Sequence, residues 1–554
     1  MKRLLTLAFI LYAVNAHAQL MDGPHPLTMK DTLRGMLTPM RTCYDVTFYD
    51  LHVRVDLEKQ GITGENTIYY TAVTDFQELQ IDLFANMEIS AITWKGKDCS
   101  FTRKFDAVFV RFPGKVKKGD TGSFTVSYHG SPQIAKNPPW DGGFTYASDV
   151  DGNPWLGVSC EGLGASVWWP NKDHLSDEPD SMSIRVEVRD DLQCISNGNL
   201  RKSFPVANGY REFDWFVSYP INNYNVTLNI GKYAHFHDAY IGINGDTLDL
   251  DYYVLPQDLD KAKKQFIQVK PMLTAYEKYL GPYPFYKDGY ALVQTPYLGM
   301  EHQSAIAYGN GYKNGYSGFD YSGIGLQFDY IIIHESGHEW WGNNVSCADI
   351  ADMWIHEGFC TYSESLYVED MYGYDVAMKY MDHEKTLVGN DAPVIGRYNI
   401  NEEGSGDMYP KGALLLNTIR TLTDNDKLWW SILRGIQHDF ALQTVSSAQI
   451  ESYIMRKAGK DYSKVFDQYL RHAAIPVMEY SLTQSDTGLL VRYHWIADVP
   501  DFNMPLRYNT GKNDFVWVYP TTEWQEMLIP DMQRGKFKWD SMHFYFKENV
   551  VRSN

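Results

Sequence analysis

Four residues near the middle of the chain have the types and spacing of a catalytic zinc site. His334 and His338 are four positions apart, so on a helix they lie on one face and can bind the same metal ion. Glu357 follows His338 after 18 intervening residues, enough for a loop and a second helix to return a carboxylate. Two imidazoles and one carboxylate leave a fourth position open, as catalytic zinc sites require. Glu335 is then expected to act as the general base on a water molecule that the metal activates.

The flanking residues predict the elements that hold these side chains. The apolar run at 328–333 leads into the histidines as a buried segment, and Gly342 with Asn343 supplies a helix stop after them. Glu364 lies seven positions after Glu357, two helical turns on, and therefore on the same face. We expect Glu364 to orient a ligand histidine by accepting its free ring N–H. A solvated helix glutamate is the alternative at this position.

Two segments around the zinc motif resemble a known family. HESGHEWWGNNVS at 334–346 and WIHEGFCTYSE at 354–364 resemble the zinc aminopeptidases of the aminopeptidase N and leukotriene hydrolase family, which are gluzincins. LGMEH at 298–302 resembles the family's GxMEN motif, YPKG at 409–412 its YxKG motif, and Ser159-Cys160-Glu161 the segment that places an acid or amide beside the substrate's amino terminus. With the two zinc segments counted as one, four motifs in the family's order imply one zinc ion per chain and peptide substrates with a free amino terminus.

The resemblance also implies roles for individual residues. Tyr409 would donate a hydrogen bond to the oxygen that becomes negative during peptide hydrolysis. Glu301 and Glu161 would pair with the substrate's ammonium group, which an internal peptide bond lacks, so hydrolysis would start from the amino terminus. Gly299 and Met300 would line the same substrate site.

The chain departs from the family pattern at two positions in this motif. Leu298 replaces a glycine and His302 replaces an asparagine, which predicts an altered substrate pocket that keeps the ammonium anchor. Two other functions stay open as alternatives. One is a zinc endopeptidase of the thermolysin type, against which Glu301 argues. The other is a catalytically silent peptide-binding module, although the retained Glu335 and Tyr409 make it a poorer match.

The order of sequence patterns predicts a multidomain α+β fold. Residues to about 245 alternate as strands do, 259–279 and 327–472 are helical in composition, and strand patterns return from 476. We expect a β domain at 19–245, a catalytic domain at 246–475 and a β domain at 476–554. The resemblance implies a β saddle, a mainly helical thermolysin-like domain and a short β-sandwich, respectively.

The amino terminus and the composition indicate an exported protein. Residues 1–18 combine Lys2 and Arg3, an apolar run and Ala16-His17-Ala18, which is the pattern of a cleaved signal peptide. We therefore expect a periplasmic or extracellular location and no transmembrane segment after cleavage. The formal charge of −19 disfavours nucleic-acid binding. The sequence does not predict the oligomeric state or the disulfide pairing. Six cysteines allow 15 pairings. Cys347 and Cys360 could form a bridge or could both be free thiols.

Overall fold

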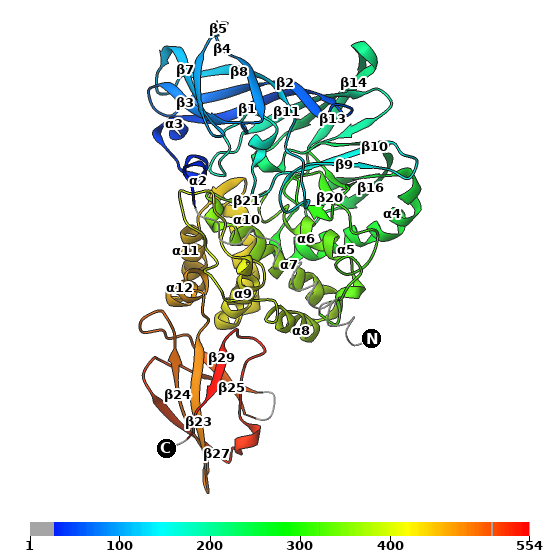
Figure 1. The fold of residues 1–554 in the computed structure, drawn as a ribbon. Helices are drawn as coiled ribbons and strands as arrows, with labels where there is room; N and C mark the ends of the chain where they lie inside the picture. The colour runs from blue at the N-terminus through cyan, green and yellow to red at the C-terminus, as the bar shows by residue number, and fades with distance from the viewer. Residues whose placement is uncertain (1–26, 321, 511–513, 553–554) are drawn as a thin grey trace, which may run out of the picture.

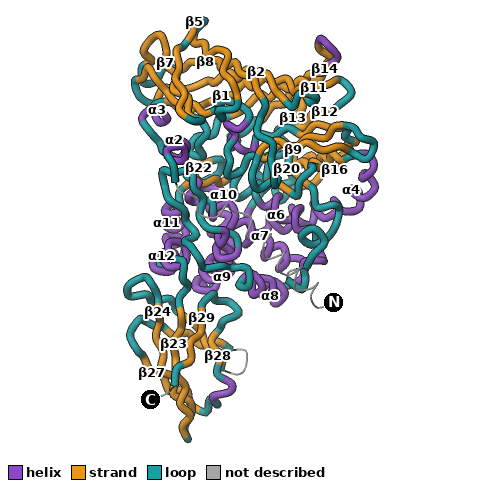
Figure 2. Tube along the Cα trace, in the orientation of Figure 1, coloured by secondary structure: helices purple, strands orange, loops and turns teal. Residues whose placement is uncertain are grey.

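The computed structural model describes residues 27–552 except 321 and 511–513. The predicted signal peptide at 1–18 therefore lies outside the described residues. Strands gather at the two ends of the molecule and most helices lie between them (Figures 1 and 2). This order along the chain confirms the predicted multidomain α+β fold class.

A large sheet forms the amino-terminal end of the molecule. The strand β1 (Tyr44–Asp56) lies within this sheet, parallel to β11 and antiparallel to β2. Tyr49, Leu51, Val53 and Val55 are buried at every second position of β1, as the alternation predicts. In spatial order the sheet contains β13 (Asn199–Val206), β14 (Tyr210–Val217), β11 (Ser181–Arg189), β1, β2 (Gly61–Ala72), β8 (Thr121–Gly130), β4 (Met87–Trp94) and β5 (Lys97–Asp98).

Two smaller sheets and two short helices complete this part. One sheet pairs β3 (Phe76–Asp82), β7 (Ala107–Val116) and β6 (Ser100–Lys104). The other holds β12 (Gln193–Ile195), β15 (Asn229–Gly231), β10 (Pro154–Ser159) and β9 (Gly143–Ser148). The helices α2 (Met29–Gly35) and α3 (Pro39–Thr42) precede β1. Because β10 ends at Ser159, the segment with Glu161 leaves this sheet as a loop.

A five-stranded sheet joins the amino-terminal strands to the helices. Its spatial order is β16 (Ala234–Ile241), β17 (Thr247–Val254), β18 (Tyr290–Gln294), β20 (Ile306–Tyr308) and β19 (Gly299–Met300). The edge strand β19 contains two of the motif residues and places Glu301 directly after them. The domain boundary expected at 245 falls in the turn between β16 and β17, which pair with each other. The domain bounds themselves stay a prediction.

The helical part is built around α7 (Trp354–Tyr372), which is buried from Trp354 through Val368. α7 packs against α5, α6, α8 and α9. The other helices are α4 (Leu259–Gln265), α5 (Val269–Leu280), α6 (Tyr330–Gly337), α8 (Tyr374–Glu384), α9 (Pro410–Thr423), α10 (Asp426–Asp439), α11 (Ser447–Ala458) and α12 (Ser463–Arg471). A strand pair, β21 (Val345–Cys347) and β22 (Gln443–Val445), links the loop after α6 to the region before α11.

Two facing sheets form the carboxyl-terminal end. One contains β27 (Gln525–Pro530), β24 (Gly488–Ile496), β23 (Val477–Ser485) and β29 (Lys547–Val550); the other contains β26 (Phe515–Val518), β25 (Leu506–Asn509) and β28 (Lys538–Trp539). Trp495, Phe502 and Trp539 are buried in its core. Among the described residues, no helix has the length and apolar character needed to cross a membrane.

Candidate metal centre and substrate site

The helix α6 presents the two histidines from its carboxyl-terminal turn. Asp329 caps the amino end, because its side chain accepts hydrogen bonds from the backbone N–H groups of Ile331 and Ile332. The helix lasts through Gly337, and His338 is its C-cap. Both imidazoles are therefore fixed on a short, buried element rather than on a mobile loop.

The three expected metal ligands converge on one point. The Nε2 atoms of His334 and His338 are 3.3 Å apart, and Oε2 of Glu357 lies 3.5 Å and 3.4 Å from them. Ligand atoms about 2.0–2.1 Å from a tetrahedral zinc ion would be separated by about 3.3–3.4 Å. The triangle formed by the two Nε2 atoms and Oε2 of Glu357 therefore has the size that zinc needs. Oε2 of Glu357 is buried and has no hydrogen-bond partner among the described residues, which is costly unless a cation lies there. The donor set fits zinc.

Each histidine is oriented through its other ring nitrogen. Oε1 of Glu364 lies 2.6 Å from Nδ1 of His334, and Tyr380 donates its hydroxyl to the second oxygen of the same carboxylate at 2.5 Å. Nδ1 of His338 lies 2.9 Å from the carbonyl oxygen of Trp341. With Nδ1 as the donor in both rings, both Nε2 lone pairs face the metal position. The structure thus places Glu364 where the spacing predicts it.

Glu335 lies beside the edge strand that carries the substrate motif. A Cβ atom on Gly299 would be 2.6 Å from Oε1 of Glu335, so glycine is needed there to admit the carboxylate. Burial raises the pKa of Glu335 to about 7, and the neighbouring His334 and His338 oppose that shift. A carboxylate with a pKa near neutrality is suited to accept and return a proton.

A close helix crossing brings Tyr409 to the same site. Gly358 on α7 and Gly412 on α9 meet: a Cβ on Gly412 would lie 2.9 Å from the Cα of Gly358. Tyr409 is the N-cap of α9 and is followed by Pro410 at the first helical position, as the sequence predicts. Its ring stacks on His334 at 6.1 Å between centroids. Burial raises the pKa of Tyr409 well above its usual value, so its hydroxyl stays a hydrogen-bond donor.

Two carboxylates from separate loops, Glu161 and Glu301, form an acidic group with the metal ligand Glu357 on α7. Oxygen atoms of Glu161, Glu301 and Glu357 lie within 4.8 Å of one another. Tyr224 donates its hydroxyl to Glu301 at 3.0 Å and fixes that carboxylate. Burial raises the pKa of Glu161 well above its usual value, with Glu301 adding to the shift. Carboxylates this close, with no basic side chain in the group, call for a cationic ligand.

Glu403 joins this group although no sequence motif singles it out. Its Oε1 would lie 2.6 Å from a Cβ on Gly162, so it rests against the loop that carries Glu161. Burial raises the pKa of Glu403 to about 7, and Glu357 and Glu301 add to the shift. Because Glu403 lies far from Glu161 in the sequence, only the folded chain brings them together.

The remaining motif residues have structural surroundings that the sequence does not reveal. Met300 is 2% exposed and packs into the amino-terminal hydrophobic core, so its side chain is not open to a substrate. His302 is fully buried, and burial lowers its pKa to about 3, so this ring is neutral. The departure from the family's asparagine therefore adds no charge to the site.

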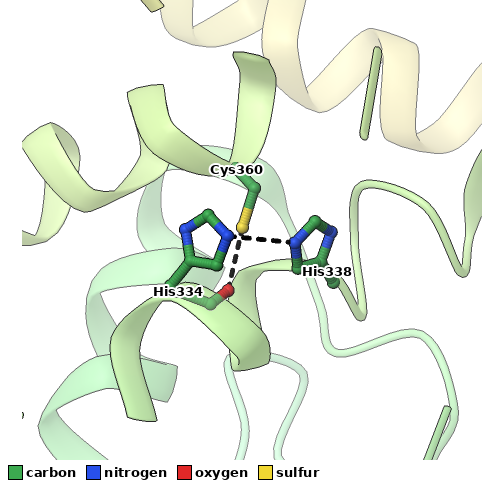
Figure 3. Close-up of side chains that lie close together, drawn as sticks. All are labelled: His334, His338 and Cys360. Atoms are coloured by element: carbon green, nitrogen blue, oxygen red, sulfur yellow. Dashed lines mark hydrogen bonds between the residues drawn. The ribbon is translucent and has the colours of Figure 1, made fainter. Parts of the chain in front are cut away.

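The cysteines are unpaired. All six lie among the described residues and have free, buried thiols, so the bridge considered between Cys347 and Cys360 is not formed. Cys360 instead donates its thiol to the backbone oxygen of His334 at 2.8 Å. Sequence reasoning considered this residue only for disulfide pairing and missed its place at the metal site, shown in Figure 3.

Comparison with known families agrees with this geometry. Residues 265–469, which carry α5 through α11, most of α12 and the three expected metal ligands, match the peptidase family M1 domain. This part of the chain is therefore similar to a peptidase family M1 domain, which agrees with the family that the motifs predict.

Individual relatives are distant in sequence. The chain is 24% identical over 304 residues to endoplasmic reticulum aminopeptidase 1 of Mus musculus, covering 52% of this chain and 32% of the relative. It is 23% identical over 477 residues to probable aminopeptidase 2 of Sulfurisphaera tokodaii, covering 80% of this chain and 55% of the relative. The chain thus spans between a third and just over half of these proteins.

A solved structure matches over nearly its whole length. An M1 zinc metallopeptidase from Deinococcus radiodurans, bound to a Tyr-Ser-Ala substrate, superimposes with a TM-score of 0.66 at 20% identity. The match covers 79% of this chain and 97% of the other. It shows that the two proteins share a fold.

Proposed function

We propose that the protein is a zinc aminopeptidase that hydrolyses the first peptide bond of peptides with a free amino terminus. The observation that carries the proposal is the triangle of His334, His338 and Glu357 with Glu161 and Glu301 beside it. The triangle has the dimensions of a zinc site, and the acidic group is placed to receive a substrate ammonium close to the reacting bond. One zinc ion per chain is part of the proposal.

The residues around the triangle have separate roles in hydrolysis. Zinc, when bound by the three ligands, supplies Lewis-acid chemistry that polarises the scissile carbonyl and makes water more acidic. Glu335 accepts a proton from the attacking water and later delivers it to the leaving amine. Tyr409 donates its O–H to the carbonyl oxygen as that atom gains negative charge. Glu364 and the Trp341 carbonyl hold the two imidazoles in the required tautomer.

The acidic group favours an exopeptidase over an endopeptidase. A substrate bound through an internal peptide bond would bring no cation to Glu301 and Glu161 and would leave their charges unpaired in a buried setting. A free amino terminus supplies an ammonium ion with three N–H donors. Glu403 increases the negative charge that this ammonium meets.

The comparisons support the proposal without carrying it alone. The matched relatives are named as aminopeptidases, and the matched metallopeptidase from Deinococcus radiodurans is bound to a short peptide. Residues 1–18 support a further part of the proposal, which is export to the periplasm or the extracellular space.

Digestion of a matched pair of peptides tests the function. One peptide carries a free amino terminus and the other, of the same sequence, an acetylated one; products are followed by mass spectrometry with and without a chelator. The proposal predicts stepwise loss of amino-terminal residues from the free peptide alone, stopped by the chelator and restored by zinc. Internal cleavage of both peptides would instead establish an endopeptidase. Absence of cleavage by the zinc-loaded protein would contradict any peptidase function.

A further inference from the structure

The short helix α2 lies between the amino-terminal sheets and the helical part of the molecule (Figure 1). It has only seven residues, and the side chains of Thr28 and Asp31 form a capping box at its first turn. A helix this short is not stable alone in water, so its contacts with the rest of the protein must hold it. Its last two residues, Arg34 and Gly35, are buried and make such contacts.

Arg34 contacts the loop that carries Glu161. Its guanidinium donates to the backbone oxygen of Leu163, two positions after Glu161, and lies 3.8 Å from the carboxylate of Asp173. A Cβ atom on Gly164 would be 2.6 Å from Nη2 of Arg34, so glycine is needed there for the guanidinium to approach. A cavity of about 40 Å³ is lined in part by Arg34, Gly164 and Asp173. Because packing against this loop is incomplete, its position depends on the hydrogen bond from Arg34.

The helix α2 also contacts the loop that carries Glu403. The backbone N–H of Asn401 donates to the backbone oxygen of Asp31 at 3.1 Å. Gly35 lies against the same loop, because a Cβ atom on Gly35 would overlap the backbone of Ile400. One short helix is therefore in contact with both loops that bring these carboxylates to the substrate site.

The two loops need such a connection because their carboxylates repel each other. Burial raises the pKa of Glu161, and the neighbouring carboxylates, Glu403 among them, add to this shift. The direct hydrogen bond between the loops is long, since the amide of Asn401 lies 3.5 Å from the backbone oxygen of Gly162. We propose that Arg34 is a positioning residue: through α2 it holds the Glu161 loop beside the Glu403 loop, so that the site for the substrate ammonium is formed before a peptide binds. This inference rests on the proposed function and deepens it.

Amide hydrogen exchange of the whole protein tests the positioning independently of the reaction. Exchange is followed by mass spectrometry in the native chain, Arg34→Met and Lys30→Met. Lys30 provides a matched control, because it is a cation of the same helix whose side chain pairs with Asp106 at 2.9 Å in the amino-terminal part. Arg34→Met should raise exchange at 161–164 and also at 400–403, whereas Lys30→Met should leave both segments as in the native protein. Unchanged exchange in Arg34→Met, or a rise at 161–164 alone, would overturn the proposal.

Two further variants extend the exchange test. Arg34→Lys keeps a charged donor for the carbonyl of Leu163, so it should retain the native pattern. Gly35→Ala places a methyl group against the backbone of Ile400 and disturbs α2 at its other contact, so exchange should rise at 161–164 as well. This variant decides the question even if Arg34→Met does not fold. Native exchange at 161–164 in Gly35→Ala would contradict a connection through α2.

Steady-state kinetics separate positioning from a general loss of stability. Arg34→Met should raise KM for a free peptide by about 3- to 30-fold and keep kcat within about twofold, because a smaller fraction of the molecules has the ammonium site formed. Lys30→Met should keep the native KM even if its thermal midpoint falls. A native KM in Arg34→Met, or a loss confined to kcat, would refute the role of Arg34. Failure of the native protein to cleave any peptide would instead refute the proposed function, and the exchange pattern would still test the connection between the loops.

Discussion

Replacing Glu301 by glutamine should selectively weaken the processing of substrates with a free amino terminus. The side chain is 2% exposed and accepts a hydrogen bond from Tyr224. The amide of Glu301→Gln has nearly the same shape and keeps an oxygen for Tyr224, so the fold and the metal triangle should be preserved. What is lost is one negative charge facing the substrate ammonium.

The structure sets the size of this effect. Leaving a buried charge without any partner costs about 3–5 kcal/mol, but Glu161 and Glu403 remain beside the ammonium. The loss should therefore be nearer the ~1.5–3 kcal/mol of one hydrogen bond to a charged group. At 1.36 kcal/mol per factor of ten, kcat/KM should fall roughly 10- to 150-fold.

The assay compares free and acetylated versions of one short peptide with native protein and Glu301→Gln. The acetylated peptide, which has no ammonium, should be a poor substrate for both proteins. The ratio of kcat/KM for the free peptide to kcat/KM for the acetylated peptide should therefore be smaller for Glu301→Gln than for the native protein. Bound zinc and the thermal midpoint serve as controls for the fold. An unchanged kcat/KM for the free peptide, or an equal loss for the acetylated one, would refute the role assigned to Glu301.

Four further substitutions test the other groups of the site. Glu335→Ala should retain zinc and lose turnover; a normal rate would exclude Glu335 as the base. Tyr409→Phe should lower kcat by about 10²- to 10³-fold with little change in KM, as loss of an oxyanion donor does. A kcat equal to that of the native protein in steady-state assays would exclude Tyr409 as the oxyanion donor. Glu364→Gln should weaken zinc binding by about 10- to 100-fold in a competition titration, because His334 loses its charged partner; native affinity would show that Glu364 does not act on the metal. The pKa of Glu403 is raised to about 7 by burial, so its carboxylate forms as the pH rises through about 7, and kcat/KM for free peptides should rise over that range. Glu403→Gln should make this rise shallower, since Glu335 titrates in the same range; a superimposable pH profile would show that Glu403 does not face the substrate.

The parts of the site that sequence predicts are those set by local geometry. Helical periodicity alone places His334 above His338 and Glu364 on the face of Glu357, and the structure has both arrangements. Pro410 fixes the first turn of α9 and so places Tyr409 at the N-cap of that helix. The strand alternation of the terminal regions likewise gives the fold class, because one face of each sheet is buried.

The parts that sequence does not predict depend on contacts between distant segments. Glu403 meets the acidic group only because its loop rests against Gly162. Tyr224 reaches Glu301 from a short helical turn with no motif of its own. Cys360 reaches the backbone of His334 only because Gly337, on a different helix, makes room for its sulfur. None of these contacts has a fixed spacing along the chain, so no periodicity or motif could indicate them.

Titration of metal-free protein with zinc tests the central claim most directly. Bound zinc and the rate of release of the first residue from a free peptide are measured at each addition. The account predicts negligible release without zinc, a rate proportional to bound zinc, and a plateau at one zinc ion per chain. Full activity in the metal-free protein, or no release once one zinc ion is bound, would contradict it.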